Sequence, residues 1–312
     1  MKAWQLTTIN QPLELVELPD PVPAAGEIVV DPVVTGLCHS DVAYQDGTLG
    51  PLPLPLVLGH EIAGVVSAVG DDVTKFAIGD RVAIRAGAET PGTSMDGGFA
   101  DKVLTPVEFV TRIPEGVSFE FAAVGTDAGL TSYHAVRVVG EVTAGMKVGI
   151  IGLGGLGYFG AQEAAGLGAR VYAAEPNEAA QAAAAEFGYE RISADITDFV
   201  GEDLDVIVDF AGFGTTTAGA LAAVKPGGRV VQVGLGRVES LIRTDLLVQK
   251  QIHLVGSVAG TIEDLDEVLS MIGEGKLKPL ISTIGFDDVP EGLARLARGE
   301  VRGRLVAQVN QG

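Results

Sequence analysis

The sequence Gly-Leu-Gly-Gly-Leu-Gly at residues 152–157 limits what this chain can fold into more than any other feature. A short apolar run (147–151) precedes it, and a run of small residues with helical character (154–169) follows it. Glycines in this order allow a tight turn, a close approach of backbone N–H groups to a pyrophosphate, and close packing of the helix on the strand. The strand, turn and helix therefore predict a dinucleotide site. Its candidate residues are Gly152, Gly154, Gly155, Leu156 and Gly157.

An acidic residue stands where such a site needs one. Glu175 ends the next predicted strand (170–175), about twenty residues after the glycine loop. A carboxylate there accepts hydrogen bonds from ribose hydroxyls and repels a 2′-phosphate, and residues 176–190 contain no Lys or Arg. Glycines that serve only as turns and packing contacts are the simpler explanation of the loop, but they leave this spacing unexplained. NAD is therefore favoured over NADP.

The middle of the chain alternates strands with helices. A helix is expected at 177–188, ending in glycine, and further apolar strands are expected at 204–212, 227–235 and 252–260. This alternation predicts an α/β fold with a doubly wound parallel sheet. The chain then returns to two helices (262–275 and 290–299) and a final strand (303–309).

The first 120 or so residues have a different texture. Short β-type runs at 27–34, 62–70 and 80–87 are separated by Pro and Gly, which predicts a β-rich domain. The Pro-rich segment 51–61 is expected to be an extended loop that leads to His60.

Composition excludes several classes of protein. The chain has 312 residues, of which 47% are hydrophobic, enough for a sizeable core. The 41 acidic and 21 basic residues give a net charge of −20, which disfavours binding to nucleic acid or anionic lipid. The single cysteine, Cys38, excludes an intrachain disulfide and a Cys₄ zinc site. No signal peptide or run of about 18 apolar residues is present, so a soluble cytoplasmic protein is expected.

Cys38 and His60 are candidate metal ligands. They lie in the segments GLCHSD (36–41) and GHE (59–61), each beside a glycine and a carboxylate in a predicted loop. Cysteine and histidine are zinc ligands, but a lone cysteine is more often a small buried apolar residue and a lone histidine a satisfied polar one. These residues alone leave both interpretations open.

The order of the motifs is more specific than any one of them. GLCHSD, GHE, GDRV (79–82), AGLTSYHA (128–135), the glycine loop and the closing GRLVAQV occur in one order along the chain. In this the sequence resembles the zinc-dependent medium-chain alcohol dehydrogenases over essentially its whole length. The resemblance implies a GroES-like catalytic domain in two pieces, 1–128 and 262–312, and a Rossmann domain, 129–261.

The resemblance also implies one catalytic zinc ion. Cys38 and His60 match two ligands of the family, and the third position, usually a cysteine, is Asp127 here. A carboxylate carries the same charge as a thiolate and is itself a zinc ligand; a helix N-cap or a solvated loop residue is the alternative for Asp127. In the family Glu61 lies behind the metal as a transient ligand, and Asp41 holds the imidazole of His60.

Other residues receive roles only from the resemblance. Ser40 bonds the substrate oxygen and begins a proton relay, but Ala43 stands where many members end that relay with a histidine. His39, Val233 and an arginine near the C-terminus are expected at the cofactor; Arg304 is favoured over Arg302 for its pyrophosphate. His134 and His253 are assigned no chemistry.

The expected activity is reversible hydride transfer between a small alcohol and NAD, with the ketone or aldehyde as the other product. Segment 83–102 has no cysteine and is too short for the structural zinc lobe of many members, so one metal ion per chain is expected. A zinc-free quinone or enoyl reductase of the same superfamily is one alternative, and a non-catalytic NAD-binding protein is another. A homodimer or homotetramer, with no nucleic-acid or membrane partner, is expected.

Overall fold

The computed structural model describes residues 1–184 and 188–310. The chain divides into two compact units. The N-terminal unit consists of Met1–Asp127, Thr261–Gly275 and Pro279–Gly312, and the central unit of Ala128–Gly260 and Lys276–Lys278. The end of the helix expected at 177–188 falls partly outside the described residues.

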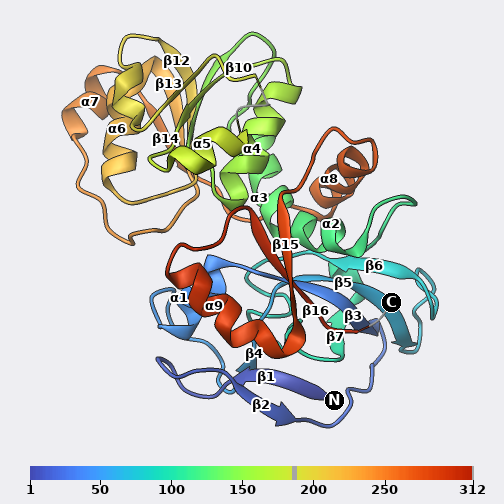
Figure 1. Cartoon of the computed structure of the whole chain (residues 1–312). Coiled ribbons are helices and arrows are strands. Elements are labelled where there is room, and N and C mark those ends of the chain that lie inside the picture. The colour runs from blue at the N-terminus through green and yellow to red at the C-terminus, as the bar shows by residue number, and fades with distance from the viewer. Residues whose placement is uncertain (185–187, 311–312) are drawn as a thin grey trace. The chain divides into compact units, whose positions relative to one another are not determined.

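The central unit is built on a parallel sheet (Figure 1). Its described strands lie in the order β11-β10-β9-β12-β13-β14, and every described pairing is parallel. The strands are β9 (Lys147–Ile151), β10 (Arg170–Ala174), β11 (Arg191–Ser193), β12 (Leu204–Asp209), β13 (Val224–Gln232) and β14 (His253–Gly256). The helices are α3 (Leu130–Tyr133), α4 (Gly155–Gly166), α5 (Glu178–Ala184), α6 (Thr215–Ala223), α7 (Thr244–Gln249), the π-helix η3 (His134–Val139) and the 3₁₀-helix η5 (Ile196–Phe199). The predicted α/β class with a parallel sheet is confirmed.

Apolar side chains cover both faces of this sheet. Val148 and Ile150 of β9 belong to one buried cluster, and Ile151 with Tyr172 of β10 belongs to another. Adjacent residues of a strand point to opposite faces, so a strand buried on both sides reads as a continuous apolar run. This is why KVGII is recognisable in the sequence as a central strand.

The N-terminal unit is β-rich and is built from both ends of the chain (Figure 1). Its larger sheet has the order β15-β16-β3-β5-β6-β8, with β7 also paired to β3, and a smaller sheet has the order β2-β1-β4. The strands are β1 (Lys2–Leu6), β2 (Glu14–Glu17), β3 (Glu27–Leu37), β4 (Leu56–Val57), β5 (Glu61–Val69), β6 (Arg81–Ile84), β7 (Val103–Pro106), β8 (Val110–Arg112), β15 (Ile281–Gly285) and β16 (Arg304–Gln308). The helices are α1 (His39–Gln45), α2 (Phe119–Val124), α8 (Ile262–Gly273), α9 (Val289–Ala297), the 3₁₀-helices η1 (Val107–Phe109) and η6 (Phe286–Asp288), and the π-helix η2 (Gly125–Gly129), whose last two residues belong to the central unit.

Some strands are shorter than the apolar runs that predicted them. The strand expected over 204–212 ends at Asp209, because the Asp209 carboxylate accepts hydrogen bonds from the N–H groups of Ala211 and Gly212 and turns the chain.

Among the described residues, no helix is long and apolar enough to cross a membrane.

Glu163 is a buried acid in the core of the central unit. It lies on α4 with no exposed surface, and neither carboxylate oxygen has a hydrogen-bond partner among the described residues. Arg137 Nε, on a partly exposed side chain of η3, is 3.9 Å from Glu163 Oε2. Burial raises the pKa of Glu163 to about 8, against the attraction of Arg137. The folded chain therefore keeps this carboxyl group protonated at neutral pH.

The raised pKa of Glu163 predicts a loss of folding stability as the pH rises. The variant Glu163→Gln should not show this loss. Above the ordinary value of 4.5 the unfolded chain releases this proton while the folded chain retains it, so stability falls as pH rises from 4.5 to about 8. The advantage of the variant in free energy of unfolding should grow by up to about 1.4 kcal/mol per pH unit across that window and then level off. Urea titrations at several pH values measure it. Glu178→Gln, which changes an exposed glutamate of the same unit, is the matched control, and a pH-independent advantage of Glu163→Gln would contradict the assignment.

Candidate functional site

Four potential metal ligands lie together in the N-terminal unit. One ligand atom each from Cys38, His60, Glu61 and Asp127 falls in a group whose members are all within 4.8 Å of one another. Strand pairing explains part of this. Gly36 of β3 is opposite Glu61 of β5, so Cys38, just after β3, lies near His60, just before β5. Asp127 comes from η2, about 66 residues further along the chain. We call these four residues the metal cluster.

Cys38 is buried and lies against two polar partners. Its Sγ is 3.4 Å from Asp127 Oδ2 and 3.6 Å from Ser40 Oγ. Burial opposes ionisation of the thiol, but the charge of Arg304 and the contact with His60 outweigh it, so the pKa of Cys38 lies below its usual value. A lowered pKa favours the thiolate, which is the form that binds metals.

Asp41 holds both ligand-bearing loops. It is fully buried; its Oδ2 accepts a hydrogen bond from the Cys38 N–H (2.9 Å) and its Oδ1 accepts one from the Gly59 N–H (3.2 Å). His60 Nδ1 is also 3.2 Å from Asp41 Oδ1. This leaves His60 Nε2 on the side of Asp127, with its Oδ2 at 3.8 Å. The arrangement is that of a carboxylate that orients a ligating imidazole.

The two carboxylates of the metal cluster respond differently to burial. For Asp127, burial is outweighed by His60 and Arg304, so the pKa of its carboxyl group is lowered and it stays ionised. For Glu61, burial dominates over the attraction of Arg304, and the negative charges of Asp127 and Cys38 act in the same direction, so its pKa is raised well above normal. Burial also opposes the protonation of His60, but Asp41 and Asp127 raise its pKa well above normal. The binding of a metal ion must therefore displace protons.

Arg304 lies inside the cluster of acids. It is 4% exposed, and its guanidinium is 3.0 Å from Glu61 Oε1 and 3.1 Å from Asp127 Oδ2. The sequence suggested a contact with a cofactor pyrophosphate, which stays a prediction; the alternative, Arg302, is exposed. Sequence reasoning missed this buried counter-charge. No local signal could have found it, because the pairing of β16 with β3 brings together residues about 270 positions apart.

The residues present fit a zinc ion. A thiolate, an imidazole and a carboxylate are all zinc ligands, and ligand atoms around a tetrahedral zinc lie about 3.3–3.8 Å from one another. Asp127 Oδ2 is 3.4 Å from Cys38 Sγ and 3.8 Å from His60 Nε2, and both separations lie in that range. Both oxygens of Glu61 are buried without a hydrogen bond among the described residues, although Arg304 is close. Paired with Arg304 but without a hydrogen bond among the described residues, this buried carboxylate keeps lone pairs for a further bond to the same ion.

The neighbouring residues on α1 differ in their exposure. Ser40 is half-buried and borders the metal cluster through Cys38 Sγ, whereas His39 is exposed. Tyr44 lies four residues after Ser40, one turn further along α1, and was not singled out from the sequence. Burial raises the pKa of the Tyr44 phenol. The charge of His60 lowers this pKa, and the charge of Asp41 raises it. Tyr44 is therefore a second hydroxyl on the side of α1 that faces the cluster.

The glycine loop of the central unit has the geometry that a dinucleotide needs. Gly152 has a φ of +82°, and a side chain at Gly157 would meet the Gly152 carbonyl oxygen at 1.7 Å. Above Gly154, in contrast, a Cβ would meet nothing within 4 Å, so backbone N–H groups at the start of α4 are accessible. Gly155 is the first residue of α4, and the Leu156 carbonyl accepts a hydrogen bond from Ser132 Oγ.

Glu175 is fixed beside this loop. Its Oε2 accepts a hydrogen bond from the Leu153 N–H and its Oε1 accepts one from the Asn177 N–H, both at 2.8 Å. Carboxylate oxygens have further lone pairs for ribose hydroxyls.

Val233 follows β13, and its N–H donates to the Asp209 carbonyl. The two histidines that received no role lie on η3 (His134) and on β14 (His253).

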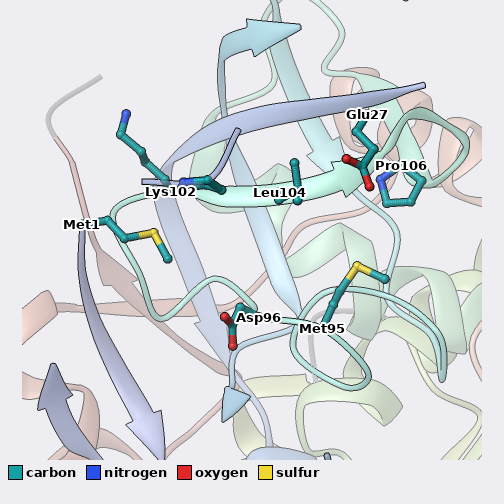
Figure 2. Close-up of a pocket in the computed structure, with 8 residues that line it drawn as sticks. Met1, Glu27, Met95, Asp96, Lys102, Leu104 and Pro106 are labelled. Atoms are coloured by element: carbon teal, nitrogen blue, oxygen red, sulfur yellow. The ribbon is translucent and has the colours of Figure 1, made fainter. Parts of the chain in front are cut away.

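A separate pocket of about 360 Å³ opens in the N-terminal unit (Figure 2). It shares no residue with the metal cluster; its lining residues are Met1, Pro21, Glu27, Met95, Asp96, Lys102, Leu104 and Pro106. Its charged groups already have partners within the protein. Lys102 pairs with Asp31, and Glu27 and Asp96 accept backbone hydrogen bonds. We assign it no ligand.

Comparison with known proteins identifies the family of both parts of the chain. Residues 24–115 match the alcohol dehydrogenase GroES-like domain, and residues 155–274 match the zinc-binding dehydrogenase family. The alcohol dehydrogenase of Geobacillus stearothermophilus is 31% identical, over 99% of this chain and 100% of its own length. The chain belongs to the medium-chain dehydrogenase/reductase family. The resemblance found in the motifs is thereby confirmed.

Solved structures of family members have the same fold. An acetophenone reductase from Geotrichum candidum, solved in complex with NAD, superimposes with a TM-score of 0.92 at 32% identity, covering 98% of this chain and 96% of that one. An alcohol dehydrogenase from the archaeon Aeropyrum pernix superimposes with a TM-score of 0.89 at 27% identity, covering 99% of this chain and 100% of that one. The GroES-like and Rossmann architecture expected for this family member is confirmed.

If Asp127 is a metal ligand, Asp127→Ala should lose zinc. The loss of one ligand should weaken zinc binding at least about a hundredfold, because even partners one step removed from a metal contribute 10–100-fold. Asp127→Cys restores an anionic ligand and should retain the metal. Zinc content after dialysis against a mild chelator, measured by plasma emission spectroscopy, tests both variants.

The matched control for this measurement is Asp31→Ala, which removes a partly exposed carboxylate of the same unit that pairs with Lys102. NADH binding by the Asp127 variants should be unchanged, since the glycine loop belongs to the other unit. Zinc content equal to wild type in Asp127→Ala would remove Asp127 from the ligand set.

Proposed function

We propose that this family member is a zinc-dependent alcohol dehydrogenase that transfers a hydride reversibly between a small alcohol and NAD. The observation that carries the proposal is the meeting of Cys38, His60 and Asp127 within a few ångströms of one another. The alcohol dehydrogenase of G. stearothermophilus and the NAD complex of the G. candidum acetophenone reductase support the same reaction class. We assign residues 1–128 and 262–312 to metal and substrate, and residues 129–261 to the dinucleotide.

Three residues are the ligands of the proposed metal site, and two others orient or supplement them. Cys38, His60 and Asp127 would hold a zinc ion, which would act as a Lewis acid and lower the pKa of a bound alcohol. Asp41 keeps the imidazole of His60 in the orientation that leaves Nε2 free as a ligand. Glu61 is a further, transient ligand; its Oε1 pairs with Arg304, and neither of its oxygens has a hydrogen bond among the described residues.

Ser40 is the proposed acceptor of the hydroxyl proton of the alcohol. Its Oγ borders the metal cluster, 3.6 Å from Cys38 Sγ, and its half-buried position keeps it in reach of solvent. Ala43 cannot continue a proton relay, so the proton passes from Ser40 to water. Bound NAD would accept the hydride from the carbinol carbon, so that the alcohol and NAD would yield a carbonyl compound, NADH and the proton released through Ser40.

The cofactor is proposed to bind at the glycine loop. Backbone N–H groups at residues 154–157 face its pyrophosphate, and Glu175 accepts hydrogen bonds from the adenosine ribose. His39, Val233 and Arg304 are further proposed contacts, taken from the family pattern. The action of the enzyme in the cytoplasm remains a prediction.

Purified protein tested with a panel of alcohols, ketones and aldehydes decides between the candidate functions. Turnover followed by NADH absorbance, with about one zinc per chain, supports the proposal. Full activity on quinones or enones without zinc would indicate the zinc-free reductase instead. NAD binding without turnover on any substrate would indicate a non-catalytic protein.

Glu175→Ser should shift cofactor preference toward NADP(H). The change removes a carboxylate that repels a 2′-phosphate. If the repulsion falls by about 1.4 kcal/mol, the ratio of kcat/KM for NADPH to that for NADH rises tenfold. Steady-state kinetics with both cofactors measures the ratio. Glu178→Ser, an exposed glutamate three residues away, is the control. An unaltered ratio in Glu175→Ser would count against its contact with the ribose.

We also propose a homo-oligomer formed through the edge of the parallel sheet. β14 ends the described strand order, and Leu254 on it and Val258 just after it are 36% and 82% exposed. An edge strand with exposed apolar side chains is suited to pairing with a second copy.

Leu254→Glu places a like charge on both copies of this edge and should shift the protein to monomer. Light scattering coupled to size exclusion measures the mass. Leu280→Glu introduces the same substitution at an equally exposed leucine of the other unit and is the control. A Leu254→Glu protein of wild-type mass would exclude this edge as the interface.

A further inference from the structure

Asp209 is a buried carboxylate that the proposed reaction does not use. It ends β12, has no exposed surface, and has no ion-pair partner among the described residues. Four donors converge on it instead. The N–H groups of Ala211 (3.1 Å) and Gly212 (2.8 Å) donate to Oδ1, and the hydroxyls of Thr216 (2.8 Å) and Thr217 (3.0 Å) are within donating distance of Oδ2. A buried charge is tolerated when hydrogen bonds satisfy it in this way.

The contacts continue from Asp209 to the next strand. Thr217 Oγ1 is also 2.9 Å from Gln232 Oε1 at the end of β13, so its single proton serves two acceptors. Gln232 Nε2 donates to the Gly234 carbonyl at 2.7 Å. The Asp209 carbonyl accepts the N–H groups of Val233 and Gly234. One set of side chains therefore holds the chain after β12 and the chain after β13.

The two loops that follow these strands are bound to each other. We call Ala211–Gly214 and Val233–Arg237 the loop pair. The Gly236 N–H donates to the Ala211 carbonyl (3.2 Å), and the Arg237 N–H donates to the Gly212 carbonyl (2.9 Å). Gly212 has a φ of +65°, and a side chain on it would meet the Gly234 carbonyl oxygen at 1.8 Å. The backbones therefore approach too closely for any other residue at Gly212.

Sheet topology places the loop pair on the opposite side of the dinucleotide crossing from Glu175. In a doubly wound sheet the ligand crosses the carboxyl ends of the strands where the order of strands reverses, here between β9 and β12. The glycine loop follows β9, and Glu175 follows β10 on one side of the crossing. The loop pair follows β12 and β13 on the other side. A Cβ built on Gly152 would lie 3.3 Å from the Ala211 Cβ, so the glycine loop and the loop pair are neighbours.

We infer that Asp209, Thr217 and Gln232 form a positioning network that holds the loop pair in the shape that binds the nicotinamide nucleotide of the cofactor. This inference rests on the proposed function, because it assumes that the dinucleotide is NAD. Side chains locked by one another fix a loop before the ligand arrives, so less conformational freedom is lost on binding. Loosening the network should weaken contacts to the nicotinamide half and leave the adenosine half, beside Glu175, unaffected.

Binding of two probes to the whole chain separates the two halves. NADH carries both nucleotides, whereas ADP-ribose lacks the nicotinamide ring but keeps the adenosine and pyrophosphate. Thr217→Val keeps the shape of the side chain and removes its hydrogen bonds. We expect its dissociation constant for NADH to rise about tenfold, as the loss of a buried hydrogen-bond partner does, with that for ADP-ribose unchanged. NADH fluorescence and calorimetry measure the two constants.

Matched variants separate this effect from a general loss of structure. Thr215→Val is the same substitution two residues earlier on α6, at an exposed side chain outside the network, and should change neither constant. Thr217→Ser retains the hydroxyl and should restore NADH binding. Gln232→Met breaks the network from the β13 side and should reproduce the Thr217→Val result, so the inference does not depend on the folding of one variant.

Each outcome has one meaning. Weaker NADH binding with unchanged ADP-ribose binding in Thr217→Val and Gln232→Met supports the network. Equal losses for both probes, or no loss for either, would overturn it and leave Asp209 as a structural turn. Wild-type protein that binds neither probe would overturn the proposed function itself, and the inference with it.

Discussion

The pairing of β5 and β16 with the two edges of β3 is the constraint on which the metal cluster depends. Gly36 is opposite Glu61 on one side of β3, and Leu37 is opposite Leu305 on the other. Cys38, His60 and Arg304 therefore meet at one end of the sheet, although they come from distant parts of the chain. A shift of either strand by one residue would turn its side chains to the opposite face and scatter the cluster.

Burying this many ionisable groups together requires them to compensate one another. The thiol, the imidazole and two carboxylates lie within 4.8 Å of one another, and Arg304 contributes the fixed positive charge among them. The opposite pKa shifts of Asp127 and Glu61 show the balance. His60 and Arg304 lower the pKa of Asp127, whereas for Glu61 burial outweighs the attraction of Arg304 and raises the pKa. Removing one member of such a set leaves the others uncompensated, which is costly in a buried site.

Local patterns predicted the elements, and the order of motifs predicted the family. The run KVGII, the glycine loop and Glu175 carry their meaning in a few adjacent residues, so the parallel sheet and the dinucleotide loop were predictable. Strand ends were not, because Asp209 terminates β12 through side-chain hydrogen bonds that no apolar pattern reveals. The buried position of Arg304 depends on pairing between the two ends of the chain, which a sequence without a known fold does not specify.

The guanidinium of Arg304 has a consequence for how tightly the site retains its ion. An arginine cannot release its proton in a protein, so its charge persists whether the site is filled or empty. It attracts the same Asp127 and Glu61 oxygens that a divalent ion would take, and it repels that ion. Arg304 thus offsets the negative charge of both carboxylates within the protein. A divalent ion that binds these ligands must share their oxygens with a fixed positive charge.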